Sequence, residues 1–166
     1  MADEWQQARL REMPINVLTV PELGSLIFQF GSYRMHWRYL DALRAKVYDR
    51  ALSSEYVPKL GISASCNSSA NTIVIGFDVL SRFSLVGLLL HECVHAAMDN
   101  AKHSKLTNGQ SEAIAYVCQW VYLQQKGVGP TDMDFGGDEQ LANISTQAAL
   151  CAGYVIAKMA IPVVVS

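Results

Sequence analysis

The segment Leu88-Leu89-Leu90-His91-Glu92-Cys93-Val94-His95-Ala96-Ala97-Met98-Asp99 places two histidines four positions apart within an apolar run. On an α-helix, positions i and i+4 lie one above the other on the same face. The imidazoles of His91 and His95 can therefore bind one metal ion, and Glu92 projects close to that ion without being a ligand. The spacing predicts a zinc-binding helix on which Glu92 takes a proton from metal-bound water.

The apolar setting of this motif favours a metal over a chance match. Leucines precede the motif and Val94, Ala96, Ala97 and Met98 surround its second half. Burying polar or charged side chains without partners is strongly unfavourable, and one metal ion is the simplest partner for all of them. The alternative is a buried histidine pair that ordinary hydrogen bonds satisfy.

A third ligand is expected from Glu112, which lies 17 residues after His95 and is the only acid in the run Ser111–Tyr122. A catalytic zinc site needs three protein ligands and one open position for water. A carboxylate isolated among alanine, isoleucine and valine is unfavourable without a partner. We therefore expect a second helix, from Thr107 or Asn108 to about Lys126, that crosses the first with Glu112 facing the histidines.

The pattern His91-Glu92-x-x-His95 followed by Ser111-Glu112-Ala113-x-Ala115-Tyr116 resembles the gluzincin group of zincin metallopeptidases. The resemblance covers about residues 70–127. In that group the two histidines and a glutamate on the following helix bind zinc, and the glutamate between the histidines is the general base. The resemblance implies a zinc metallopeptidase in which His91, His95 and Glu112 are the metal ligands and Glu92 is the catalytic base.

The longer run, from His91 to Asp99 and from Glu112 to Tyr122, is also similar to small bacterial proteins suspected to be metallopeptidase toxins or secretion-system effectors. That resemblance implies a delivered toxin with an immunity protein or another partner. It leaves the substrate open between a protein, a peptidoglycan peptide and a small peptide.

The oxyanion that forms during amide hydrolysis needs a further hydrogen-bond donor. Tyr116, one turn after the third ligand, is the first candidate, and a packed aromatic is the alternative. His36 and His103 are the next candidates, although a core or boundary histidine and a surface histidine are the simpler interpretations. Asp99, one turn after the second histidine, either orients an imidazole or lies in solvent at the helix end.

Two short runs, Ile62–Ser65 and Thr72–Phe77, predict a β-hairpin just before the metal helix. The second run is either an ordinary packed strand or has a free edge that pairs with an extended peptide. Asp78 or Ser81 caps the metal helix, which ends near Ala101. We expect an α+β, mostly helical fold: a minimal zincin-like domain with a small antiparallel sheet beside the active-site helix.

The N-terminal third has its own signals. Residues 2–12 predict a short polar helix that Pro14 ends, and Ile15–Val20 predicts a strand or an extended arm. Thr19-x-x-Glu22, with Pro21 in the first turn, has the pattern of a capping box. It predicts one long helix to about Leu52, with a core-facing stripe of Leu23, Leu26, Ile27, Phe30, Trp37, Leu40, Leu43 and Val47.

The C-terminal stretch Glu139–Ala160 predicts a helix. Its apolar run from Ala148 to Val165 contains Lys158 and Pro162, which makes it short and interrupted for a membrane span. We expect this helix to pack in the core or against a partner protein rather than to enter a membrane.

Composition narrows the class of protein. With 166 residues, 51% of them apolar, the chain is expected to form a single domain over residues 1–166. A net charge of −2 leaves no basic excess for neutralising phosphates, so no nucleic-acid partner is expected. The N-terminus has no secretory signal, which predicts a protein that is cytoplasmic as synthesised, and a toxin would then leave through a specialised secretion system. The four cysteines are interpreted as buried free thiols.

Three functional classes follow. The first is a zinc hydrolase that cleaves an amide bond, with a peptide bond as the expected substrate. The second is a zinc-stabilised binding or regulatory module without catalysis. The third is a metal-free helical interaction protein with an adhesive C-terminal helix.

Overall fold

The computed structural model describes residues 13–24, 26–49, 51–57, 64–67, 70–75, 82–101, 106–132 and 139–159. Residues 13–18 are helical, and the longer helices are α2 (Trp37–Tyr48), α3 (Arg82–Asn100), α4 (Asn108–Gln125) and α5 (Glu139–Met159). Two 3-10 turns, η1 (Pro21–Leu23) and η2 (Pro130–Asp132), join them. The strands are β1 (Ile27–Phe30), β2 (Tyr33–His36), β3 (Ser53–Tyr56), β4 (Ala64–Asn67) and β5 (Thr72–Ile75). The expected α+β, mostly helical class is confirmed.

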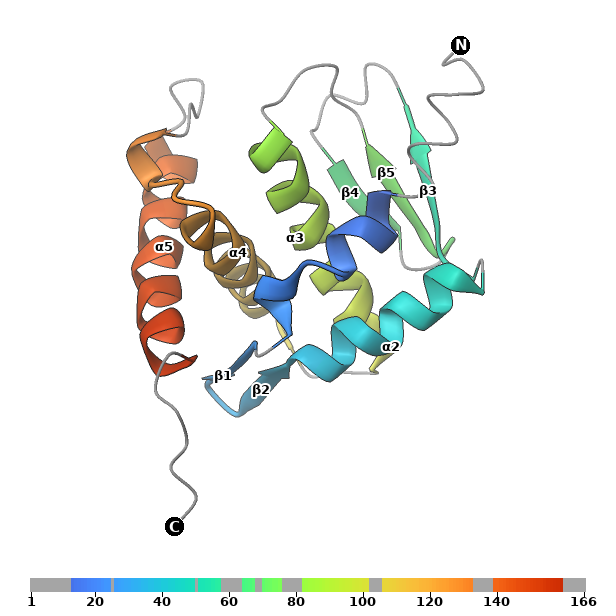
Figure 1. Ribbon diagram of the computed structural model, residues 1–166, viewed down its shortest axis with the longest axis horizontal. Coiled ribbons are helices and arrows are strands. Elements are labelled where there is room, and N and C mark those ends of the chain that lie inside the picture. Colours follow the sequence, from blue (N-terminus) through green and yellow to red (C-terminus); the bar gives the residue numbers. More distant parts are fainter. Residues whose placement is uncertain are drawn as a thin grey trace.

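Helix α3 lies in the middle of the arrangement, with the three-stranded sheet on one side and α4 on the other (Figure 1). Helix α5 packs on α4 and forms the outer layer, while α2 packs against α3. The core is therefore centred on α3 and α4, and its fully buried side chains include Leu89, Leu90, Val94, Ile114, Trp120 and Leu123. The histidine motif lies on α3, between α4 and the three-stranded sheet.

Local sequence explains where α4 begins and ends. The Thr107 hydroxyl accepts a hydrogen bond from the Gln110 backbone, and the Gln110 side chain bonds the Thr107 backbone in return. This reciprocal pair satisfies two amides that a helix start leaves without partners. At the other end, Gly127 adopts a φ of 77°, a conformation that glycine takes at little cost. The expected helix from Thr107 or Asn108 to about Lys126 is confirmed.

The expectation of one long helix from Thr19 to Leu52 is wrong. Among the described residues of this stretch, only η1 and α2 are helical, and between them β1 and β2 pair as an antiparallel hairpin. The hairpin turns at Gly31, which has a φ of 58°. Strands rich in aromatic residues around a glycine favour a hairpin, and that preference overrides the three- and four-residue spacing. Leu40, Leu43 and Val47 of the expected stripe are buried on α2. Leu23 and Leu26 are also buried, but they lie outside that helix.

The expectation for the segment before η1 is also wrong. Residues 13–18 are helical, so Ile15–Val20 is neither a strand nor an extended arm, and Pro14 does not end a helix there. Val17 and Leu18 are buried in the core. This burial outweighs the weak strand preference of β-branched residues. The helix expected for residues 2–12 lies outside the described residues.

The predicted hairpin before the metal helix is confirmed, because β4 and β5 pair antiparallel. Strand β5 lies in the centre of the sheet, however, since β3 pairs with its other side in parallel. Of the two alternatives for this run, the ordinary packed strand is therefore confirmed for Thr72–Ile75, and a free edge there is excluded. Strand β3 follows α2 and contains Ser53, Ser54 and Glu55, a polar run that no strand signal marks. Within the described residues, the edges of this sheet are β3 and β4.

Helix α5 runs from Glu139 to Met159, as expected, and packs on α4 through small side chains. Its buried residues are Ser145, Ala148, Ala149, Ala152 and Val155. The Gln124 side chain of α4 donates a hydrogen bond of 2.7 Å to the Ala149 carbonyl. No helix within the described ranges has the length and hydropathy needed to cross a bilayer. The four cysteines are free, and Cys93 and Cys118 are buried as expected. Cys66 is only partly buried, and Cys151 on α5 is exposed, so the expectation of burial is wrong for Cys151.

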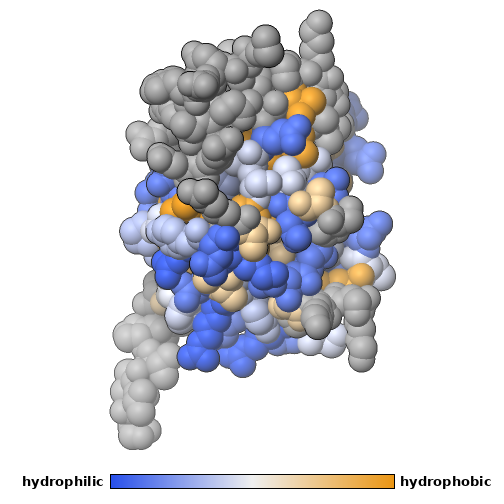
Figure 2. Space-filling view, turned by 90° about the vertical axis from the view of Figure 1, so that its right-hand side faces the viewer, coloured by the Kyte–Doolittle hydropathy of each residue, from blue (hydrophilic) through white to orange (hydrophobic). Residues whose placement is uncertain are grey.

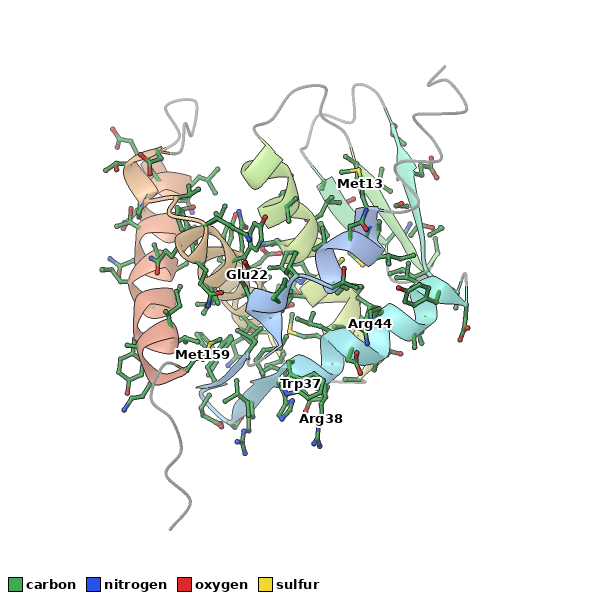
Figure 3. All side chains as sticks on the ribbon, in the orientation of Figure 1. Met13, Glu22, Trp37, Arg38, Arg44 and Met159 are labelled. Carbon is green, nitrogen blue, oxygen red and sulfur yellow. The ribbon has the colours of Figure 1, made fainter. Side chains whose placement is uncertain are left out.

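The polarity of the surface is consistent with an apolar core enclosed by these layers. Figure 2 shows the sheet side of the molecule, where the described part is mostly hydrophilic with small, separate hydrophobic areas. At the start of α2, Trp37 and Arg38 point outward together (Figure 3), and the Arg38 guanidinium carbon lies 5.8 Å from the centre of the Trp37 ring. Met159 lies at the end of α5 near the β1–β2 hairpin (Figure 3).

Candidate metal centre

The candidate site lies where α3 and α4 face each other. His91 and His95 come from adjacent turns of α3, and Glu112 comes from the first turns of α4. The Nε2 atoms of the two histidines are 3.1 Å apart. The Glu112 Oε2 atom lies 3.1 Å from Nε2 of His91, and Oε1 lies 3.3 Å from Nε2 of His95. The three residues that the sequence predicted as ligands are thus brought together.

These separations fit a metal ion. Ligand atoms about 2.0–2.1 Å from a tetrahedral zinc lie about 3.3–3.4 Å from one another. The three observed distances are within a few tenths of an ångström of that value. In the described part of the chain, His91, His95 and Glu112 form the one group of acidic, histidine or cysteine side chains whose ligand atoms could share a cation. The residues present therefore fit the metal that the motif implies.

The orientation of the imidazoles supports the same conclusion. Both rings direct Nε2 toward the other and toward the carboxylate. Only one proton fits between two ring nitrogens, so ordinary hydrogen bonds satisfy this cluster poorly, whereas a cation placed among the three atoms satisfies all of them. In the described structure, the buried Nδ1 atom of His91 has no hydrogen-bond partner. The alternative of a histidine pair fully satisfied by hydrogen bonds is therefore disfavoured.

Burial differs among the ligands in a way that leaves one side open. The side chains of His91 and His95 are 7% and 17% exposed, whereas that of Glu112 is 53% exposed. The histidines thus lie on the protein side of the site, and the carboxylate lies on its solvent side. An open coordination position toward solvent is the feature that separates catalytic from purely structural zinc sites.

Electrostatics place the ligands in the forms that bind metals. Burial lowers the pKa of His95, and the charge of His91 acts in the same direction, although Glu112 and Asp99 oppose it. The hydrogen bond from His91 lowers the pKa of the Glu112 carboxyl. The first effect favours neutral imidazole and the second favours carboxylate. Both are the forms that donate electron pairs to a metal.

Glu92 is buried beside the three ligands and is not one of them. Burial raises its pKa, the nearby charge of Glu112 adds to this, and His91 opposes it. The backbone amide of Cys66 donates a hydrogen bond to the Glu92 carboxylate, which also works against the rise in pKa. A carboxylate of raised pKa that is held beside a metal site suits proton transfer near neutral pH. The contact also places the edge strand β4 next to Glu92.

The polar contact of His95 with Ser111 was missed by sequence reasoning. The Nδ1 atom of His95 lies 2.9 Å from the hydroxyl of Ser111, the residue before Glu112. Asp99, the expected candidate, is exposed at the end of α3 and acts on His95 through its charge. The position of Ser111 next to a predicted ligand on the same helix turn was a signal that could have found it.

The other expected residues fall in different places. The Tyr116 ring packs edge-on against His91, with ring centres 4.5 Å apart, so it borders the site as a packed aromatic. Its role as an oxyanion donor stays a prediction. His36 is the N-cap of α2, where its Nδ1 atom accepts a hydrogen bond from the Arg38 backbone. It is not among the three grouped ligands. His103 and the expected caps Asp78 and Ser81 lie outside the described residues.

No protein-family model, curated protein or solved structure matches this chain. The interpretation of the site consequently depends on the geometry of its own residues and on the motif resemblance. What that geometry establishes is a His-His-Glu group that could hold a metal ion.

Proposed function

We propose that this protein is a zinc-dependent hydrolase that cleaves an amide bond, with a peptide bond as the natural substrate. The observation that carries the proposal is the convergence of His91, His95 and Glu112 beside the buried carboxylate of Glu92. Two imidazole nitrogens and one carboxylate make a ligand set that suits zinc. The Glu112 side chain is 53% exposed, so this side of the site is in contact with solvent.

A bound zinc ion supplies a Lewis acid for the substrate carbonyl and lowers the pKa of water. Glu92 accepts a proton from the attacking water at its carboxylate and returns it to the leaving nitrogen. The raised pKa of Glu92 supports the second step, because a carboxyl that protonates readily can also act as the acid. The Cys66 amide keeps the Glu92 carboxylate in place between these two steps.

Strand β4 is the element best placed to bind the substrate. It is an edge strand within the described residues, and its Cys66 amide touches Glu92. An extended peptide can add to such an edge through backbone hydrogen bonds. This arrangement favours a peptide or protein segment in extended form, including a peptidoglycan peptide, over a compact small molecule.

The experiment compares zinc content and peptide cleavage for the wild type and Glu92→Gln. We expect about one zinc per chain in both proteins, and a loss of cleavage of at least about 100-fold in the variant, since a positioned base contributes that much or more. Glu139→Gln, an exposed acid at the start of α5, is the matched control and should cleave at the wild-type rate. A wild-type protein without stoichiometric zinc would contradict the proposal, and so would an active Glu92→Gln variant.

A zinc-stabilised module without catalysis is the second candidate. It is favoured by the location of the ligands, because a metal held by His91, His95 and Glu112 links α3 to α4 across the core. In that case zinc would raise the unfolding temperature, the same peptide library would stay uncleaved, and Glu92→Gln would behave as the wild type.

The biological setting of a delivered bacterial toxin with an immunity protein rests on the motif resemblance. The same two proteins, wild type and Glu92→Gln, test it when they are expressed in a bacterium. Growth inhibition by the wild type alone supports a toxic hydrolase, and inhibition by both counts against it.

A further inference from the structure

The outer nitrogens of the two histidines have different surroundings. The Nδ1 atom of His95 lies 2.9 Å from the Ser111 hydroxyl. The Nδ1 atom of His91 is buried and has no hydrogen-bond partner in the described part of the chain. The two imidazoles are therefore not held in the same way, although they lie one turn apart on α3 and direct the same atom, Nε2, to the site.

A metal bound at Nε2 would fix the direction of the His95 hydrogen bond. A ring that binds a metal through Nε2 carries its proton on Nδ1 and donates it outward. The Ser111 oxygen accepts that hydrogen bond. The opposite direction, with serine as the donor, would leave the ring proton on Nε2 and block the lone pair that the metal needs. A hydroxyl can donate or accept, so Ser111 suits the tautomer that binds a metal and holds that ring in place by accepting its Nδ1 proton.

Chain connectivity ties this contact to the third ligand. Ser111 directly precedes Glu112, and the Thr107 capping box fixes the turn of α4 that contains both. One helix start therefore delivers a ligand and the group that orients another ligand. His91 is oriented differently, since it is 7% exposed and the Tyr116 ring packs edge-on against it.

We propose that Ser111 is a positioning residue of the metal site, which orients His95 by accepting a hydrogen bond from Nδ1 of the tautomer that binds the metal. The proposal rests on the metal centre described above and does not require that the site be catalytic. It also predicts that the effect of Ser111 is confined to metal binding, because its side chain is only half-buried and contributes little to the core.

The experiment measures zinc affinity by competition with a chromophoric chelator for the wild type, Ser111→Thr and Ser111→Val. Threonine and valine have the same shape and differ in the hydroxyl, so this pair isolates the hydrogen bond. We expect Ser111→Thr to bind zinc within about threefold of the wild type, and Ser111→Val to bind about 10–100-fold more weakly, the usual effect of removing an outer partner of a ligand. Ser145→Ala, at a buried serine of α5, is the control and should leave zinc affinity unchanged.

Two further measurements separate positioning from a loss of structure. The urea midpoint of the metal-free proteins should be the same for Ser111→Thr and Ser111→Val. Nitrogen NMR of the imidazoles should show one His95 tautomer, protonated on Nδ1, in the zinc-bound wild type, and a weaker or exchanging Nδ1 proton in Ser111→Val. Equal zinc affinity of the threonine and valine variants would overturn the proposed role of Ser111 and would leave the metal centre itself unaffected. A wild type that binds no zinc would overturn the metal centre and this inference together.

Discussion

Helix α4 has two halves with different surroundings. Its first half carries Ser111, Glu112 and Tyr116, which are only partly buried or exposed and which contact the histidines of α3. Its second half is buried without interruption from Val117 to Leu123. The comparison shows how one rigid element combines a polar, accessible end that can bind a ligand with an apolar end that holds it in position.

The apolar half determines how closely the two helices approach. A side chain at Gly87, one turn before His91 on α3, would place its Cβ atom 3.3 Å from the Leu123 side chain and 3.4 Å from that of Gln119. Glycine therefore permits a closer approach here than any other residue without a shift of these neighbours. Since α3 and α4 are rigid over this length, a close contact at this end sets the separation between Glu112 and the histidines at the other.

The largest effect is expected from a change in the apolar half. Trp120 is fully buried, and Trp120→Ala should lower the free energy of unfolding of the metal-free protein by about 3–5 kcal/mol, through lost burial and the cavity that remains. Urea denaturation measures this change. Trp120→Phe fills most of the space and should lose less. A Trp120→Ala protein as stable as the wild type would show that this half is not the stabilising one.

A change in the polar half should lower zinc affinity strongly and the stability of the metal-free protein only slightly. Glu112→Gln removes a charged ligand, so zinc affinity should fall by more than about 100-fold, beyond the range seen when only outer partners are removed. Because the Glu112 side chain is 53% exposed, the stability of the metal-free protein should change by less than about 0.5 kcal/mol. Chelator competition measures the zinc affinity, and urea denaturation of the same preparation measures the stability. Unchanged zinc binding would remove Glu112 from the site.

The smallest effect is expected at the far end of α4, where Lys126 forms an ion pair with Glu22 of η1 (Figure 3 shows Glu22). Glu22→Gln should lower the free energy of unfolding by at most about 1 kcal/mol at pH 7, the range for pairs near the surface. Zinc affinity should stay as in the wild type, because this pair lies in the apolar half. A fall in zinc affinity would contradict the division of α4.

The stability that this ion pair contributes should depend on pH. The hydrogen bond from Lys126 holds the pKa of Glu22 below its usual value, while burial opposes this. A group with a lowered folded-state pKa stabilises the protein above its unfolded pKa, about 4.3 for glutamate, and this contribution disappears as the pH falls through the folded-state pKa. The stability difference between the wild type and Glu22→Gln should therefore vanish in acid. A difference that persists at low pH would show that lost packing, not charge, separates the two proteins.

Spacing and composition alone predicted the three candidate ligands and the helices that carry them. His91 and His95 share a helix face by spacing alone, and Glu112 is conspicuous as a single acid in an apolar run. The cap at Thr107 and the apolar periodicity marked α4 because helix starts and stops depend on neighbouring residues. The C-terminal helix was predictable for the same reason.

The strands, the edge of the sheet and the contact of Ser111 could be recognised only in the folded structure. The β1–β2 hairpin has helix-like spacing in its sequence, and β3 is too polar to be recognised, because strands form by pairing with partners that are distant in the chain. Because β3 pairs with β5, the strand edge near Glu92 belongs to β4 and not to β5. The contact of Ser111 with His95 joins residues 16 positions apart on different helices, so it depends on how those helices pack. Local interactions encode a helix and its motif, whereas the groups that orient a metal ligand come from elements that meet only after folding.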